Sequence, residues 1–275
     1  MNCPPVRGER CSPYAVAPMP GLDPLAAFRL DGRVAVVTGA SSGLGDRFAR
    51  VLAAAGASVV VAARRVDRLE RLAADLPGAV AVACDVAEDA DLEALVNGTI
   101  ERFGRLDVLV NNAGTSGVVA AEHETADQIR RVIAVNLVGA HRLSQMAAGP
   151  MLAAGRGAIV NVASILGLVG VGQIPQASYS ASKAGLMGLT RELAAQWARR
   201  GVRVNCIAPG WFASEMTADM TKIPEAGLSW IQSRDPMGRP GREGELDGAL
   251  LFLASDASSY VTGHTLVVDG GWTII

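Results

Sequence analysis

"VAVVTGASSGLG", residues 34–45, joins a run of mostly β-branched residues to three glycines. The run predicts a buried strand, and the residues from Gly43 onward predict the start of a helix. Gly39 permits a tight turn, Gly43 lets the backbone approach a pyrophosphate, and Gly45 lets the helix pack on the strand. A helix N-terminus offers free N–H groups and a positive dipole end to an anion. We therefore expect this turn to bind phosphates through Gly39, Ser41, Ser42, Gly43, Leu44 and Gly45.

The rest of the chain repeats this order of strand and helix. Six more apolar runs follow at 58–63, 79–85, 106–112, 157–164, 202–209 and 265–270. Helical patterns lie near 43–55, 65–76, 89–102, 127–153 and 180–200. Continuous apolar strands separated by helices are typical of a parallel sheet covered on both faces. The pattern predicts one α/β domain over residues 30–275, a doubly wound, Rossmann-like sheet of seven strands.

Composition narrows the class of protein. The chain has 275 residues, of which 50% are hydrophobic and 19% charged, with a net charge of −2. This balance gives no electrostatic footprint for nucleic acid, and no apolar run reaches the roughly 18 to 20 residues of a bilayer span. We expect a cytoplasmic protein with no nucleic acid or membrane partner. Residues 1–29, rich in proline, are expected to form a flexible or surface-lying extension.

Cysteine and histidine show no metal-ligand spacing. Cys3, Cys11, Cys84 and Cys206 form no C-x-x-C pair, and the last two lie in strand-like runs. We interpret these two as buried free thiols. The three histidines, His123, His141 and His264, are scattered along the chain, so the sequence predicts no metal site.

The end of the second predicted strand bears on the choice of dinucleotide. A unit that binds NAD normally has Asp or Glu there for the ribose 2′-hydroxyl. This chain has Ala63, followed by Arg64 and Arg65. A guanidinium binds a 2′-phosphate by charge-assisted hydrogen bonds, so the pair favours NADP(H). NAD(H) stays open, because the two arginines are also suitable as solvated residues at the start of the next helix.

"QASYSASKAG", residues 176–185, places Tyr179 and Lys183 four apart. On a helix, side chains at this spacing share one face. A nearby cation favours the ionised form of a phenol, so Lys183, helped by a second positive charge such as an oxidised nicotinamide, is expected to lower the pKa of Tyr179. The plainer interpretation is a helix start capped by Ser178 or Ser180.

Taken together, these residues resemble the short-chain dehydrogenase/reductase family in its Tyr-x-x-x-Lys form. The resemblance covers residues 30–272 and is closest to reductases of 3-oxoacyl thioesters. It rests on the glycine turn at 38–45, Asp85, "NNAG" at 111–114, Asn136, Ser164, "YSASK" at 179–183, "PG" at 209–210 and "VDGG" at 268–271.

The resemblance implies a role for each catalytic position. Tyr179 would act as the general acid and base, and Lys183 would bond the nicotinamide ribose. Ser164 would hydrogen-bond the substrate oxygen, and Asn136 would hold a water that passes the proton toward solvent.

For the cofactor, the resemblance implies contacts along three strand ends. Asp85 and Val86 would line the adenine, and Asn112, Ala113 and Gly114 would pass the ribose and nicotinamide. Pro209 and Gly210 would border the nicotinamide, and Ser214 stands where the family often has a threonine that bonds the carboxamide.

The sequence thus predicts an NADP(H)-dependent oxidoreductase of a ketone or secondary alcohol, for example a 3-oxoacyl type or another largely apolar substrate. Two alternatives are an NAD-dependent catabolic alcohol dehydrogenase and a nucleotide-binding protein without turnover. The resemblance implies a homotetramer, or a homodimer, which a solution mass measurement would test. Apolar residues are expected to form a substrate wall: Ile165, Leu166, Leu168, Val169, Ile174, Trp211, Phe212, Met216 and Trp230.

Overall fold

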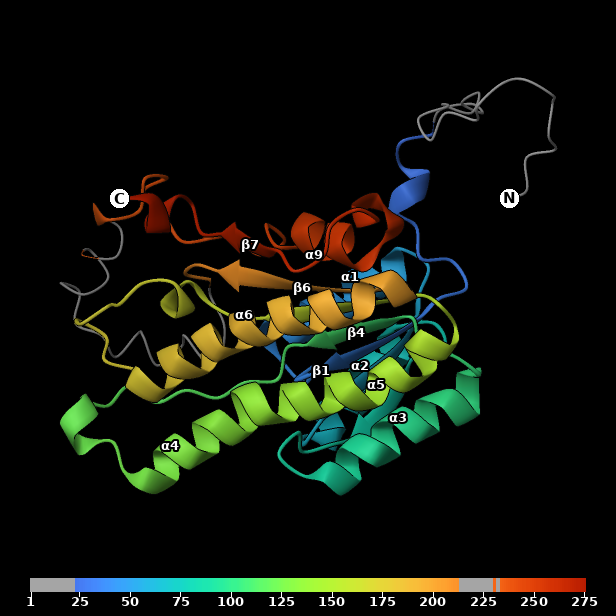
Figure 1. Cartoon of the computed structure of the whole chain (residues 1–275), viewed down its shortest axis with the longest axis horizontal. Coiled ribbons are helices and arrows are strands. Elements are labelled where there is room, and N and C mark those ends of the chain that lie inside the picture. Colours follow the sequence, from blue (N-terminus) through green and yellow to red (C-terminus); the bar gives the residue numbers. More distant parts are fainter. Residues whose placement is uncertain (1–22, 213–229, 231–232) are drawn as a thin grey trace, which may run out of the picture.

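Seven parallel strands form one sheet in the order β3-β2-β1-β4-β5-β6-β7 (Figure 1). The computed structural model describes residues 23–212, 230 and 233–275. The chain reverses its direction of winding between β1 and β4, which pair with each other at the centre. The strands are β1 Val34–Thr38, β2 Ser58–Ala63, β3 Val80–Ala83, β4 Val108–Asn111, β5 Gly157–Val162, β6 Val202–Pro209 and β7 Thr265–Val268. The predicted doubly wound fold is confirmed.

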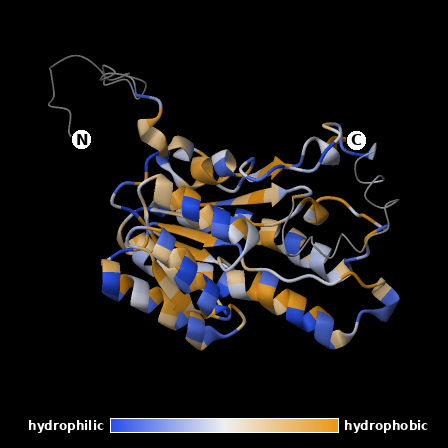
Figure 2. Cartoon of the chain, turned by 180° about the vertical axis from the view of Figure 1, so that it is seen from behind, coloured by the Kyte–Doolittle hydropathy of each residue, from blue (hydrophilic) through white to orange (hydrophobic). Residues whose placement is uncertain are grey.

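Helices cover both faces of the sheet. One apolar cluster joins alternate strand residues such as Val37 to α1, α2 and α9, and a second joins the intervening residues such as Val36 to α3, α5 and α6. The strands are the hydrophobic centre of the molecule, and the outer helices alternate apolar with polar residues (Figure 2). The helices are α1 Gly43–Ala54, α2 Val66–Asp75, α3 Asp89–Phe103, α4 Ala126–Ile133, α5 Ala140–Ala153, α6 Ala177–Trp197 and α9 Asp247–Ala254. None of the helices in the described ranges is both long and apolar enough to cross a bilayer.

Four predicted strands are shorter in the structure than the sequence indicated. β3, β4, β5 and β7 end one to two residues before the apolar runs do. The last residues of the runs leave the ladder and turn into the loops at the carboxyl edge, where Asp85, Asn112 and Ser164 stand. Of these end residues, Cys84 and Ala163 are apolar and buried, and the others are polar residues or glycine, so the ladder ends about where the polar residues of the carboxyl edge begin.

The predicted helical region 127–153 contains an irregularity that the sequence did not reveal. Residues Ala134–Gly139 form a π-helical segment, η3, between α4 and α5. Asn136 lies inside it and is 1% exposed. A π-helical turn holds one extra residue, which redirects the side chains before it and is frequent at functional sites.

The proposed N-terminal extension lies partly within the described chain. Residues Ala26–Phe28 form a short 3₁₀ turn with no buried residue, and Leu30 then enters the core. Residues 23–29 therefore lie on the surface, and 1–22 are outside the described residues. Cys84 and Cys206 are buried free thiols, as predicted.

The β1–α1 turn is held against the end of β4. The Thr38 hydroxyl accepts the N–H groups of Asn112 and Ala113, both at 3.1 Å, and Asn112 Nδ2 donates to the Thr38 carbonyl at 3.0 Å. A Cβ on Gly45 would collide with the Gly39 carbonyl and lie 2.6 Å from Asn112 Nδ2. Gly45 is therefore required for the close approach of α1 to the turn and to β4.

Alanine at two helical glycines should have opposite effects. Gly45→Ala forces the turn away from β4 and should lower the free energy of unfolding by about 2 kcal/mol or more. Gly98→Ala is the matched control, because a Cβ there meets nothing within 4 Å and α3 should gain about 0.5–1 kcal/mol. Urea unfolding of both variants measures the difference. Equal stabilities would contradict the contact assigned to Gly45.

Candidate active site

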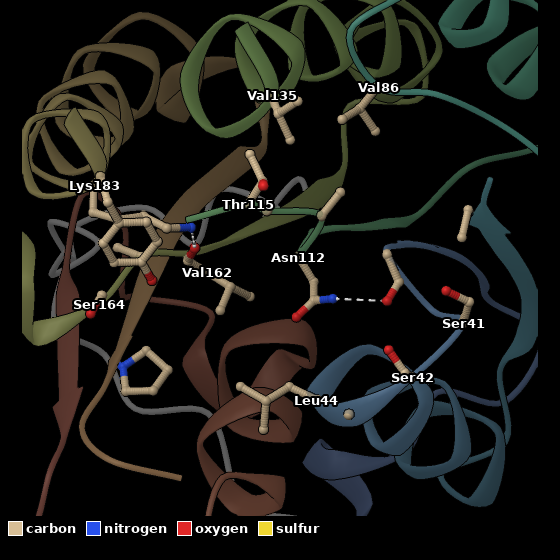
Figure 3. A pocket seen from close by; sticks show the side chains of 18 of the residues that line it. Ser41, Ser42, Leu44, Val86, Asn112, Thr115, Val135, Val162, Ser164 and Lys183 are labelled. Atoms are coloured by element: carbon tan, nitrogen blue, oxygen red, sulfur yellow. Dashed lines mark hydrogen bonds between the residues drawn. The ribbon is translucent and has the colours of Figure 1, made fainter. Parts of the chain in front are cut away.

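A cavity of about 290 Å³ opens at the carboxyl edge of the sheet. Lys183 and Ser164 lie at one end of it, Ser41 and Ser42 at the other, and Asn112 between them (Figure 3). The cavity brings together most of the predicted site residues: Gly39, Ser41, Ser42, Gly43, Leu44, Arg64, Arg65, Asp85, Val86, Asn112, Ala113, Gly114, Ser164, Tyr179, Lys183, Pro209 and Gly210.

Two predicted residues within the described chain do not line this cavity, and a third is not among the described residues. Gly45 supports the glycine turn from behind, as described above. Asn136 is buried beside the cavity in η3, and Ser214 lies outside the described residues.

The glycine end of the cavity has backbone N–H groups and guanidinium groups that are suitable for binding an anion. Ser42 is the N-cap of α1, and its side chain makes no capping hydrogen bond. The first N–H groups of the helix, at Gly43 and Leu44, therefore border the cavity without a side-chain acceptor from the cap. Arg65 Nη2 donates to Ser42 Oγ at 2.7 Å and to Ser41 Oγ at 3.0 Å, so its guanidinium lies over the turn. Arg64 Nη1 lies 3.8 Å from Asp85 Oδ2 across the same end.

At the other end, α6 presents Tyr179 and Lys183 on one face. Lys183 Nζ donates to the Val162 carbonyl at 2.7 Å and lies 5.6 Å from the centre of the Tyr179 ring. Lys183 is 4% exposed. Tyr179 shares the cavity with Ser164, which stands two residues past the end of β5. The carbonyl at the strand end thus fixes the lysine, and the lysine packs on the phenol ring.

Burial governs the electrostatics of this end of the cavity. It raises the pKa of Tyr179 above its usual value, and the interaction with the Ser164 hydroxyl lowers it only in part. Burial also lowers the pKa of Lys183 to about 8. The lowering of the Tyr179 pKa by Lys183 together with an oxidised nicotinamide stays a prediction, because Lys183 Nζ here donates to the Val162 carbonyl.

Asn136 ties the segment after β4 to α6. Its Oδ1 accepts the Thr115 N–H at 2.8 Å, and its Nδ2 donates to the Thr115 carbonyl at 2.9 Å and to Ser182 Oγ at 3.0 Å. A Cβ on Gly114 would lie 3.5 Å from Asn136 Oδ1 and 3.6 Å from Lys183 Nζ, so Gly114 borders both groups. The role of Asn136 in holding a water stays a prediction.

The cavity also has lining residues that sequence reasoning missed. Arg131 and Val135 line it from α4 and η3, one helical turn apart, and Thr115 follows the "NNAG" stretch directly. The spacing of Arg131 and Val135 indicates that they share one face of a helix, but the π-helical turn determines that this face is directed to the cavity. The others are Ala63, Cys84, Val162 and Ala163.

The predicted apolar wall is mostly a packed cluster beside Tyr179. Ile165, Leu166 and Ile174 are buried with Trp272, and Val169, Trp211 and Trp230 pack against them. Among the described members, Phe212 is the one that lines the cavity, and Leu168 is 48% exposed. Met216 lies outside the described residues. The cluster supports the catalytic end from the side rather than enclosing it.

Comparisons with known proteins agree with this architecture. A family model described as Enoyl-(Acyl carrier protein) reductase matches residues 39–273. The chain is 43% identical over 255 residues to galactitol 2-dehydrogenase (L-tagatose-forming) of Cereibacter sphaeroides, covering 92% of this chain and 100% of that one. It is 44% identical over 247 residues to cis-4-hydroxycyclohexanecarboxylate dehydrogenase of Sinomonas cyclohexanicum, covering 88% and 97%.

A solved structure gives the same result. The fold is similar to a gluconate 5-dehydrogenase from Burkholderia cenocepacia J2315 in complex with NADP and tartrate, with a TM-score of 0.85 and 38% identity over 91% of this chain and 99% of that one. The chain belongs to the short-chain dehydrogenase/reductase family and is an oxidoreductase of alcohols and ketones. The predicted family and enzyme class are confirmed.

The buried ammonium of Lys183 should leave a signature in the pH dependence of stability. With a folded pKa of about 8 and an unfolded pKa near 10.5, the unfolded state binds more protons between these values, so stability rises with pH there. Relative to Lys183→Met, the unfolding free energy of the cofactor-free wild type should increase by about 2 kcal/mol from about pH 7 to about pH 9.5. If denaturant titrations gave unfolding free energies that changed with pH in the same way for the two proteins, Lys183 would not have the lowered pKa described here.

Proposed function

We propose that the chain transfers a hydride between NADP(H) and a ketone or secondary alcohol. The observation that carries this proposal is that Tyr179, Ser164 and Lys183 share one cavity with the glycine turn and its two arginines. An acid, a hydrogen-bond donor for the substrate oxygen and a phosphate site within one cavity are the parts that carbonyl reduction needs. When bound, the nicotinamide supplies or accepts the hydride.

The residues of the chain divide the remaining work. The Tyr179 hydroxyl would exchange a proton with the substrate oxygen, and Ser164 would donate a hydrogen bond to the same oxygen. Lys183 would bond the ribose and, once drawn toward it, favour the ionised phenol. A buried phenol with a raised pKa holds its proton at neutral pH, which suits an acid in the reducing direction.

NADP(H) is favoured over NAD(H) by the charge at the end of β2. Arg65 lies on Ser41 and Ser42, and Arg64 stands beside Asp85, so two guanidinium groups flank the place of the ribose. No carboxylate follows β2 directly to repel a 2′-phosphate. The bound NADP of the Burkholderia neighbour adds support. The NAD-dependent dehydrogenase is the second candidate, favoured by the single carboxylate of Asp85 at this end.

The substrate is proposed to be a compact molecule with a secondary alcohol or ketone. The apolar side chains that line the cavity, among them Val135, Val162 and Phe212, favour a partly apolar carbon skeleton. The relatives are named for a polyol and for a hydroxylated cyclohexane carboxylate, and the 3-oxoacyl type predicted from the sequence belongs to the same chemical range.

Replacing Arg65 tests the choice of cofactor. Arg65→Ala removes the guanidinium over the turn, so the ratio of kcat/KM for NADPH to that for NADH should fall about 10- to 100-fold. Arg71→Ala is the control, because Arg71 lies on the outer face of α2 and pairs with Asp67 at 2.9 Å. Steady-state rates with both cofactors measure the ratio. An unchanged ratio in Arg65→Ala would exclude this role.

A substrate panel with a matched pair of variants tests the chemistry. Galactitol, cis-4-hydroxycyclohexanecarboxylate, gluconate and a 3-oxoacyl thioester are assayed by nicotinamide absorbance. Tyr179→Phe should lower kcat about 10²- to 10⁴-fold with the affinity for NADPH unchanged, since only the proton donor is lost. Tyr260→Phe, at a fully exposed tyrosine, should match the wild type. Near-normal turnover in Tyr179→Phe would refute the proton transfer, and cofactor binding without any turnover would favour the nucleotide-binding alternative.

A further inference from the structure

The helix that carries Tyr179 does not cap its own N-terminus. α6 begins at Ala177, and its N-cap residue, Gln176, makes no side-chain hydrogen bond. Neither Ser178 nor Ser180 acts as the cap, so that interpretation of the sequence is wrong. The N-terminus of this helix of 21 residues therefore has free N–H groups and the positive end of the helix dipole. An acceptor from elsewhere in the chain is needed.

Glu124 supplies that acceptor from the loop before α4. One carboxylate oxygen accepts the hydroxyl of Ser178, and the other accepts the Ser178 N–H at 3.4 Å. Ser178 is 7% exposed and Glu124 is half-buried, so the contact is shielded from water. Ser178 directly precedes Tyr179, and the carboxylate therefore holds the turn from which the phenol projects.

The same loop holds the approach to α6 at a second point. The Val119 N–H donates to the Pro175 carbonyl at 3.1 Å, and Val119 forms a parallel bridge with Gln176. Farther along, Asn136 reaches Ser182, whose hydroxyl donates to the Tyr179 carbonyl at 2.7 Å. All three contacts come from the segment that follows the "NNAG" stretch. The strand end that lines the cofactor cavity is thus linked to the turn that carries the phenol.

We propose that Glu124 is a positioning residue for Tyr179, acting through Ser178. This inference rests on the proposed role of Tyr179 as the proton donor. The carboxylate fixes the first turn of α6 in rotation and along its axis, so the phenol oxygen stays within reach of Ser164 and the substrate oxygen. Loss of the carboxylate lets that turn fray, and a reacting group displaced by about 1 Å loses much of its rate. The proposed cofactor contacts other than Lys183 lie on other elements and keep their geometry. Lys183, one turn farther along α6, keeps its hydrogen bond to the Val162 carbonyl.

Three variants test the proposal in the full-length protein. Glu124→Ala should lower kcat about tenfold while the dissociation constant for NADPH stays within about twofold. Glu124→Gln keeps an acceptor for the N–H and an amide for the hydroxyl, so it should recover kcat to within about threefold of the wild type. Glu122→Ala changes an exposed carboxylate in the 3₁₀ turn Ala121–His123, which directly precedes Glu124, and it should leave both quantities unchanged. A wild-type kcat in Glu124→Ala, or a parallel loss of NADPH binding, would overturn the proposal.

Two more measurements separate positioning from the function itself. The double variant Ser178→Ala, Glu124→Ala should have a kcat no lower than that of Glu124→Ala alone, because both substitutions remove the same contact between the two side chains. Multiplied losses would overturn the shared contact. Hydrogen exchange of the peptide over 177–183 should be faster in Glu124→Ala than in Glu122→Ala, and α3 should be unaffected. Equal exchange in the Glu124→Ala and Glu122→Ala variants overturns the positioning role, even if no substrate is found. If exchange is faster in Glu124→Ala but the wild type turns over no substrate, the result counts against the proposed function alone.

Discussion

The close approach of the β1–α1 turn to the end of β4 is the contact on which the rest of the site depends. The Gly39 carbonyl occupies the space that a side chain at Gly45 would need, and Asn112 bonds the same turn from the other strand. This contact closes the point where the winding of the sheet reverses. It sets the direction of the first N–H groups of α1, and it places the "NNAG" stretch between the glycine turn and the end of the cavity that holds Tyr179 and Lys183.

The catalytic end is arranged at a cost in stability. A lysine with 4% exposure has one carbonyl as its hydrogen-bond partner in the described structure and no carboxylate within ion-pair distance. Burial of a cation in this way is unfavourable unless a ligand shares the charge. The phenol beside it is also held away from its ionised form. The protein thus has two buried groups, Tyr179 and Lys183, whose pKa values are shifted by the loss of water. A bound ligand that interacts with them would reduce this cost, and such shifted groups are typical of functional sites.

Much of this could be read from the sequence because it depends on period and order. Apolar runs of β-branched residues located all seven strands, and the glycine spacing at 39–45 located the β1–α1 turn that lines one end of the cavity. The features that the sequence did not give depend on contacts between distant segments. The carboxylate that caps α6 comes from Glu124, 54 residues before Ser178. The π-helical turn at Asn136 has no local signal, since its extra residue is accommodated by packing against α6 and the end of β4.

That π-helical turn has a consequence for how the chain can change over evolutionary time. An ordinary helix tolerates a lost or gained residue only by rotating everything on one side of it by about 100°. Here α4, with Arg131, and α5, with its buried face against the sheet, are phased relative to each other by the one surplus residue in Ala134–Gly139. Insertions and deletions in this segment should therefore be purged.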